Sequence, residues 1–330
     1  MKRRDFITLI GGAPVAWPLA AHAQQDQMRR IGALMDTAES NPVGQTRIAE
    51  FRQGLQELGW SDGRTIRIDT RWAGGDAERA RVLAAELVGL KPDAIFAFGN
   101  GQLRPLSQQT NSIPIVFVGA SDPVGAGYAA SFARPGGNIT GFTLFEPSMV
   151  GKWVAALKEI APALVQVAFM VNPDTAVLHG KLYSAAFEAA AATLMVEPVT
   201  VDVYSVSDIE AAIGTLGQRP NIGLIVHPDG FFEAHREVIV THAARHRVPA
   251  IYGGRNFPPS GGLMSYGPDL VDACRRATTY IDRILRGEKP GELPIQAPTR
   301  FQMVVNLKAA KALGLDVPPS LLVRADEVIE

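Results

Sequence analysis

The stretch AIFAFGNGQLRPLSQQTNSIPIVFV, residues 94–118, decides the fold class of this chain. It begins with a run of apolar residues, continues through a mostly polar segment, and ends in a second apolar run at 114–118. Strands that are apolar throughout are expected where helices cover both faces of a parallel sheet. The stretch therefore predicts two parallel strands joined by a short helix.

The same alternation of apolar runs and amphipathic helices extends along the chain in both directions. Expected strands begin near residues 31, 66, 94 and 115 in the first half, and near 167, 199, 222 and 249 in the second. Two such series of strand–helix–strand units imply two doubly wound lobes. We therefore predict an α/β protein of two parallel-sheet lobes joined by a hinge.

The region after Gly253-Gly254 follows two complete series and is most simply explained by the chain crossing back between the lobes. It contains a strand-like run, a long helix and a proline-rich stretch before a last strand and helix. We expect residues 28–145 and about 255–297 to form the first lobe. We expect residues 146–254 and about 298–330 to form the second.

Residues 1–23 have the layout of a cleaved export signal. Basic residues at 2–4 precede a short apolar run, and Ala21-His22-Ala23 supplies an A-x-A cleavage pattern. The apolar run is too short to span a bilayer. The pair Arg3-Arg4 resembles the start of a twin-arginine signal, and a general secretory route is the alternative. We expect the protein to act in the periplasm.

The cysteine count and the charge exclude several classes of protein. Cys274 is the only cysteine, so there is no intramolecular disulfide and no cysteine near the expected cleavage site to carry a lipid. The net charge is −1 and basic residues do not cluster, so nothing indicates a nucleic-acid partner. We expect a diffusible monomer that is not lipid-anchored.

Polar residues follow the expected strands in both halves of the chain. Open α/β sheets bind ligands beyond the carboxyl ends of their strands, and two lobes with these edges facing each other form a cleft. Hinge closure around a ligand is a common use of such a cleft. The residues that we expect to contact the ligand are Asp36, Asn41, Asn100, Gly101, Ser121, Asp122, Asn172, Asp229 and Tyr252.

Some of these residues have an alternative structural role. One of Asp36 and Asn41 is expected to cap the following helix, which leaves the other for the ligand. Asp229 is either a carboxylate that pairs with a ligand ammonium group or the N-cap of the next helix. Residues 121–122 either bond to the ligand or form a turn before the next proline. Tyr252 either stacks on a planar ligand or packs in the core.

No constellation of catalytic or metal-binding residues is evident. His242 and His246 have the i, i+4 spacing of a zinc site, but no Glu follows His242 and no third ligand is evident. The sequences around Ser121 and Ser265 each lack one glycine of the G-x-S-x-G nucleophile motif. We therefore expect no enzyme activity, no metal and no cofactor.

Several long stretches are distinctive as motifs. They are FRQGLQELGW (51–60), RWAGGDAERARVLAAELV (71–88), IPIVFVGASDPVGAGYAASFARPGGNITG (113–141), GGLMSYGPDL (261–270) and VVNLKAAKALGLDVPPSLLVRADEVIE (304–330). Together they closely resemble the tryptophan/tyrosine-type family of ABC-transporter substrate-binding proteins, from about residue 30 to the end of the chain.

This resemblance implies a type I periplasmic-binding-protein fold. It also implies delivery of one small ligand, such as an amino acid or a related amide or carboxylate, to an inner-membrane permease powered by a separate ATPase. The chain departs from the family at one place, where Asn100 follows Gly99 and many members have Gly-Thr. The residues leave two alternatives open, a ligand-sensing protein for a membrane receptor and a secreted α/β enzyme.

Overall fold

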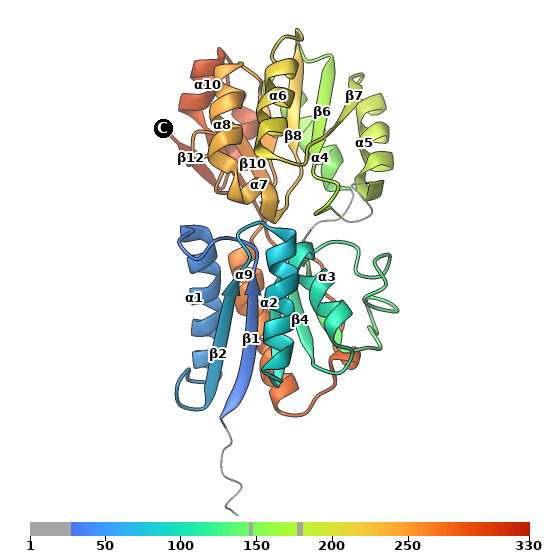
Figure 1. The fold of residues 1–330 in the computed structure, drawn as a ribbon. Coiled ribbons are helices and arrows are strands. Elements are labelled where there is room, and N and C mark those ends of the chain that lie inside the picture. Colours follow the sequence, from blue (N-terminus) through green and yellow to red (C-terminus); the bar gives the residue numbers. More distant parts are fainter. Residues whose placement is uncertain (1–27, 145–147, 177–180) are drawn as a thin grey trace, which may run out of the picture.

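The structure is a computed structural model that describes residues 28–144, 148–176 and 181–330. These residues form two α/β lobes, one above the other in Figure 1, with the chain passing between them. The expected export signal at 1–23 lies outside the described residues. Both lobes contain the parallel strands that the sequence predicts, in one separate sheet each.

The first lobe contains a five-stranded sheet in the order β2-β1-β3-β4-β5, with every pair parallel. Its strands are β1 (Arg29–Met35), β2 (Ile66–Trp72), β3 (Ala94–Phe98), β4 (Ile115–Ala120) and β5 (Ile139–Thr143). Its helices are α1 (Pro42–Glu57), α2 (Ala77–Gly89), α3 (Asn100–Gln109) and α9 (Leu270–Leu285), with the 3-10 turn η2 (Pro290–Glu292).

Helices cover both faces of this sheet, which explains why β3 and β4 are apolar throughout. Helices α1 and α9 pack on one face, where Phe51 stacks on Phe96 with ring centroids 4.3 Å apart. Helices α2 and α3 pack on the other face through residues such as Leu87 and Leu103. All side chains of β3 and β4 are buried as a result.

The second lobe contains a seven-stranded sheet in the order β12-β11-β10-β9-β8-β6-β7, in which only β10 and β11 are antiparallel among the described pairs. Its strands are β6 (Gln166–Val171), β7 (Glu197–Asp202), β8 (Ile222–Val226), β9 (Ala250–Tyr252), β10 (Met264–Pro268), β11 (Phe301–Asn306) and β12 (Glu327–Ile329). Its helices are α4 (Met149–Ile160), α5 (Lys181–Thr193), α6 (Val206–Leu216), α7 (Gly230–Ala234), α8 (Arg236–Arg245), α10 (Leu307–Leu313) and α11 (Pro319–Arg324).

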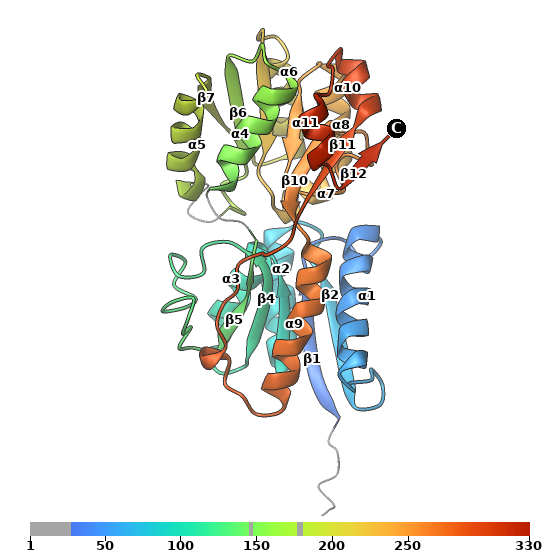
Figure 2. The same ribbon diagram turned by 180° about the vertical axis from the view of Figure 1, so that it is seen from behind.

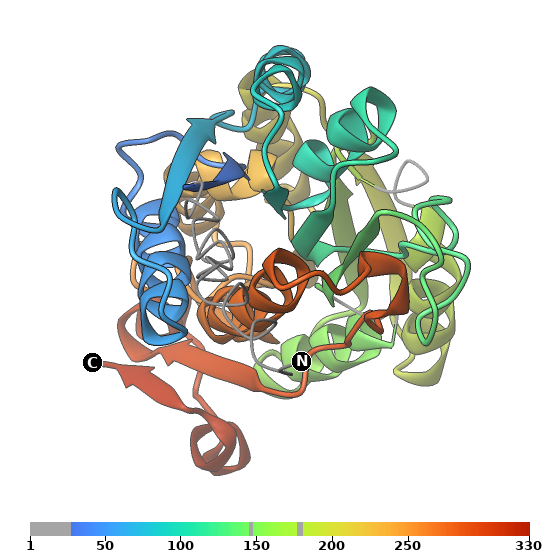
Figure 3. The ribbon, with the colours of Figure 1, turned by 90° about the horizontal axis from the view of Figure 1, so that it is seen from below.

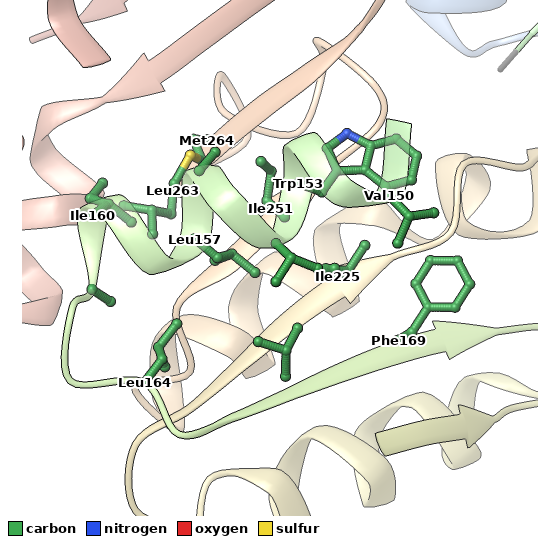
Figure 4. Packing of buried hydrophobic residues seen from close by; sticks show 14 of the residues in the cluster. Val150, Trp153, Leu157, Ile160, Leu164, Phe169, Ile225, Ile251, Leu263 and Met264 are labelled. Atoms are coloured by element: carbon green, nitrogen blue, oxygen red, sulfur yellow. The ribbon is translucent and has the colours of Figure 1, made fainter. Parts of the chain in front are cut away.

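The largest core of this lobe forms around α4. Figure 4 shows Trp153, Leu157 and Ile160 of α4 packing on side chains of the sheet. Trp153 is fully buried, and its indole N–H donates to the carbonyl oxygen of Tyr266 at 2.7 Å, which satisfies the polar atom of an otherwise apolar side chain. Helices α6, α7 and α8 cover the opposite face.

The predicted boundary near residue 255 is corrected by the position of β10. Met264 of this strand pairs with Ile251 of β9, so the backbone of 264–268 belongs to the second sheet. The chain returns to the first lobe at Asp269, which caps α9. A strand sequence specifies extended backbone but not which sheet edge it joins, so the expected boundary fell short by about one strand.

Helix α9 completes the first lobe from a distant part of the chain. It packs beside α1, as the view from below shows (Figure 3), and the indole N–H of Trp60 donates to Asp282 at 2.8 Å. Figure 2 shows the chain then running back along the first lobe before it enters β11. No helix among residues 28–144, 148–176 and 181–330 is long and apolar enough to cross a membrane.

Candidate functional site

A cavity of about 280 Å³ lies between the two lobes. The first lobe lines it with the ends of β1, β3 and β4 and with the starts of α2 and α3. The second lobe lines it with the end of β8, helix α7, and residues 174–175 and 253–254. The cavity therefore lies at the carboxyl ends of parallel strands from both sheets, where open α/β sheets bind ligands.

Four of the predicted ligand residues line this cavity. They are Asp36, Asn100, Gly101 and Asp229. Asp36 follows β1, residues 100–101 begin α3, and Asp229 follows β8. Each therefore follows the carboxyl end of a strand, which is the position that the sequence pattern indicated.

The other predicted ligand residues lie outside the lining of the cavity. Asn41 caps α1, where its side-chain oxygen accepts from the N–H of Val43 at 2.9 Å, so the cap role goes to Asn41 rather than to Asp36. Asn172 accepts from the N–H of Asp174 at 2.9 Å in a turn after β6. Both side chains bond to local backbone, which is the common use of Asn in turns and caps.

Three further predictions fall in the loop after β4 and in β9. Asp122 has a φ of 41° and accepts from the N–H of Gly125 at 2.8 Å, which fits the turn alternative. Ser121 is buried and accepts from the hydroxyl of Tyr183 at 2.9 Å. Tyr252 is buried and stacks on Phe257 at 4.4 Å, and burial raises the pKa of its hydroxyl.

Asp36 is a buried carboxyl group in the wall of the cavity. Only 4% of the residue is exposed, and the Arg47 guanidinium lies 3.4 Å from both of its carboxylate oxygens. Burial raises the pKa of Asp36 to about 6, the charge of Arg47 opposes this rise, and Glu233 of the opposite lobe adds to it. The ionisation of Asp36 therefore depends on groups from both lobes.

The sequence patterns did not indicate Arg47 and Glu233, which both line the cavity and are buried. The guanidinium of Arg47 lies 4.2 Å above the ring of Phe98, a cation–π contact. Its signal in the sequence is a cation on the apolar stripe of α1, one turn before Phe51. Glu233 follows Asp229 by one helical turn and accepts from the side-chain amide of Asn256 at 3.1 Å.

Asp229 takes the N-cap role that the sequence suggested, and it also lines the cavity. One carboxylate oxygen accepts from the N–H of Phe232 at 3.0 Å and caps α7. The other accepts from the hydroxyl of Thr175 at 2.8 Å and lies 3.4 Å from Nδ1 of His227. These bonds fix the orientation of a carboxylate in the cavity wall.

The lobes contact each other at two glycines. A Cβ added at Gly230 of the second lobe would lie 3.0 Å from Cβ of Asp36 in the first. Gly75 of the first lobe has a φ of +80°, and a Cβ there would lie 3.2 Å from Cβ of Ala234. The two lobes therefore meet with little space between their backbones on one side of the cavity.

Comparisons with known proteins agree on one family. A family model described as ABC transporter substrate binding protein matches residues 40–329. A curated relative, the Tyrosine-binding protein of Clostridioides difficile (strain R20291), is 24% identical over 265 residues, which are 80% of this chain and 75% of the relative.

Two solved structures share the fold over nearly the whole chain. An ABC domain in complex with L-Trp from Streptococcus pneumonia has a TM-score of 0.84 at 23% identity, and the match covers 92% of this chain and 100% of that one. A conserved domain protein from Vibrio cholerae O1 biovar El Tor has a TM-score of 0.84 at 24% identity, with the same coverage of both chains.

Proposed function

Because the chain belongs to the ABC transporter substrate-binding protein family, whose members bind solutes and are not enzymes, we propose that it is the periplasmic binding component of an importer. In this role it closes two lobes over one small ligand and delivers it to an inner-membrane permease driven by a separate ATPase. The type I periplasmic-binding-protein fold that the resemblance implied is confirmed by its structural neighbours.

The observation that carries this proposal is the cavity between the lobes. Its volume of about 280 Å³ is close to the lower end of the roughly 300–1,000 Å³ typical of small-molecule sites. Both lobes contribute polar groups to its wall, so a ligand that contacts both of them stabilises the closed arrangement over the open one.

The chemistry of the wall favours a ligand with an ammonium group. Asp36 and Asp229 present carboxylates, and Glu233 adds a third from α7. A primary ammonium group donates three hydrogen bonds and pairs with such carboxylates. The rings of Phe98 and Phe231 supply apolar surface for the rest of the ligand.

The start of α3 offers a complementary place for a ligand carboxylate. Gly99 precedes this helix and provides no side-chain cap, so its first N–H groups are left for another acceptor. Residues 99–102 line the cavity, and a helix N-terminus attracts anions. We therefore propose an amino acid as the ligand, and the relatives named for tyrosine and solved with L-Trp make those two the first candidates.

The test is isothermal titration and thermal unfolding of the purified protein with a matched set of ligands. The set contains L-tyrosine and L-tryptophan, then tyramine, which lacks the carboxylate, and 3-(4-hydroxyphenyl)propionate, which lacks the amino group. We expect an amino acid to bind and to raise the Tm, and each truncated analogue to bind at least 10-fold more weakly, since a charged hydrogen bond is worth about 1.5–3 kcal/mol.

Two outcomes would contradict different parts of the proposal. Absence of stabilisation across a wide panel of amino acids, carboxylates, sugars and amides would contradict a solute-binding role. Equal affinity for the amino acid and for the analogue without an amino group would contradict recognition by the carboxylates while leaving the solute-binding role intact.

A further inference from the structure

One hydrogen bond joins the two lobes at buried side chains. The hydroxyl of Tyr183, in α5 of the second lobe, donates to the hydroxyl oxygen of Ser121, which follows β4 in the first lobe, at 2.9 Å. Each residue is 1% exposed. Separation of the lobes would break this bond, so it exists only while the lobes are together.

The donor is held in place by the core of the second lobe. The ring of Tyr183 packs edge-on against His227 at 5.2 Å and against Phe169 at 6.1 Å. Burial raises the pKa of Tyr183 to about 12, so the hydroxyl keeps its proton at any physiological pH. Tyr183 therefore presents a fixed donor to the first lobe.

The acceptor is connected to the wall of the cavity. The backbone N–H of Ser121 donates to the side-chain oxygen of Asn100 at 3.0 Å, and Asn100 lines the cavity. The backbone after Ser121 is constrained too, because Asp122 has a φ of 41° and bonds to Gly125. One hydrogen bond therefore links Ser121 to a residue that lines the cavity.

We propose that Tyr183 and Ser121 form an interlobe latch, a pair of positioning residues that favour the closed arrangement without contacting the ligand. This inference rests on the proposed binding function and extends it. It gives Ser121 a role different from the ligand contact that the sequence suggested. The latch raises the closed population before binding, and the apparent affinity rises in proportion to that population.

The expected size of the effect follows from the worth of one hydrogen bond. A neutral hydrogen bond contributes a net factor of about 2 to 10 to an equilibrium constant. Loss of the latch should therefore lower the ratio of closed to open molecules by about 2- to 10-fold. When the closed state is the minor one, affinity for the ligand should fall by the same factor.

The experiment measures the distance between the lobes in the ligand-free protein. Nitroxide labels on cysteines at Thr46 of α1 and Ala211 of α6, both exposed helix positions, report this distance by electron–electron double resonance in a Cys274→Ala background. We expect Tyr183→Phe and Ser121→Ala each to increase the open population. We expect the double variant to equal either single variant, because both changes remove the same bond.

Tyr280→Phe is the matched control for a lost buried tyrosine hydroxyl. The hydroxyl of Tyr280, in the core of the first lobe, donates to the carbonyl oxygen of Pro294 at 2.6 Å and accepts from the side-chain amide of Gln296 at 2.8 Å. This variant should lower the Tm without changing the interlobe distance. The latch proposal would be overturned if Tyr183→Phe had the same interlobe distances as the wild type. It would also be overturned if the effects of the two single variants added in the double variant. Because no ligand is present, failure to find a ligand would count against the proposed function and leave this result unaffected.

Discussion

Asp36 shows how one side chain can respond to the position of a whole lobe. In the structure its pKa is raised to about 6 by burial, and Gly230 and Glu233 of the opposite lobe contribute to its surroundings. When the lobes separate, Asp36 keeps Arg47 but loses these neighbours, so its pKa falls toward the ordinary value of about 3.9. The closed form then binds the proton more tightly than the open form does.

The sign of the resulting pH effect follows directly. A group whose pKa is higher in the closed form favours closure at low pH, and this contribution is lost as the pH rises through about 6. We expect the ligand-free protein to shift toward the closed form between pH 7.5 and pH 5. Asp36→Asn, which cannot ionise, should be more closed than the wild type at pH 7.5 and should not respond to pH. Distances between spin labels on the two lobes measure the closed population of the wild type and of Asp36→Asn at each pH. An Asp36→Asn variant that responds to pH as the wild type does would contradict the assignment of the pH effect to Asp36.

Gly230 is expected to limit how far the lobes can close. The nearest atom to a methyl group there is Cβ of Asp36 in the opposite lobe, at 3.0 Å, and no positive φ forbids alanine at this position. We expect Gly230→Ala to weaken ligand binding by about 1–3 kcal/mol, the usual cost of overpacking, with little change in Tm. Gly89→Ala is the control, since nothing lies within 4 Å of its added carbon. Equal affinities of both variants by calorimetry would show that this contact does not govern closure.

At the scale of single residues, the sequence predicted which polar residues follow strands. It did not predict which of their side chains line the cavity. Asp36 directly follows β1 and Asp229 lies three residues after β8, and both line the cavity. Asn172 directly follows β6 and Asn41 directly precedes α1, and both side chains bond instead to backbone N–H groups two residues ahead. Arg47 was missed because a helix position says nothing about a carboxylate that arrives from another element.

Among the elements, β5 was missed because its role depends on a neighbour. Its five residues include Gly141, where an added Cβ would lie 2.1 Å from the carbonyl oxygen of Phe117 in β4. The sequence patterns predicted no strand between those that begin near residues 115 and 167, since a glycine within a short strand weakens the pattern. The neighbouring backbone, rather than the side chains, determines that these residues form a strand.

Gly141→Ala should destabilise the first lobe strongly. The added carbon cannot avoid the β4 backbone without moving one of two buried strands, and we expect a loss of about 3 kcal/mol or more. Urea unfolding should show a lower midpoint for this variant. Gly137→Ala, in the loop just before β5 with nothing within 4 Å, should unfold like the wild type. Equal urea midpoints for Gly141→Ala and the wild type would mean that β4 and β5 can move apart without loss of stability.

At the scale of the whole molecule, the repeated strand–helix series predicted the two lobes and their parallel sheets. The sequence also indicated that a late segment returns to the first lobe. It could not place β10, because extended residues such as Met264 pair with whichever edge the tertiary fold presents. The antiparallel strand β11 then extends the second sheet beyond what a simple repeat of units provides.

The expected destination outside the cytoplasm has its own test. We expect Arg3-Arg4→Lys-Lys to abolish export if the twin-arginine pathway is used, because that pathway requires the arginine pair. Unchanged periplasmic protein in cell fractions would assign export to the general secretory route. Cytoplasmic retention of the wild-type chain would contradict a periplasmic role altogether.

The packing of α9 on α1 also determines the order in which the molecule can be assembled. Cys274, Ala277 and Ile281 complete a core with Ile48 and Phe51 of α1, which are made more than two hundred residues earlier. During synthesis from the N-terminus, the part of this sheet face that α1 does not cover therefore stays exposed until α9 emerges. A chaperone that shields this part of the face during that interval would protect the nascent chain from aggregation.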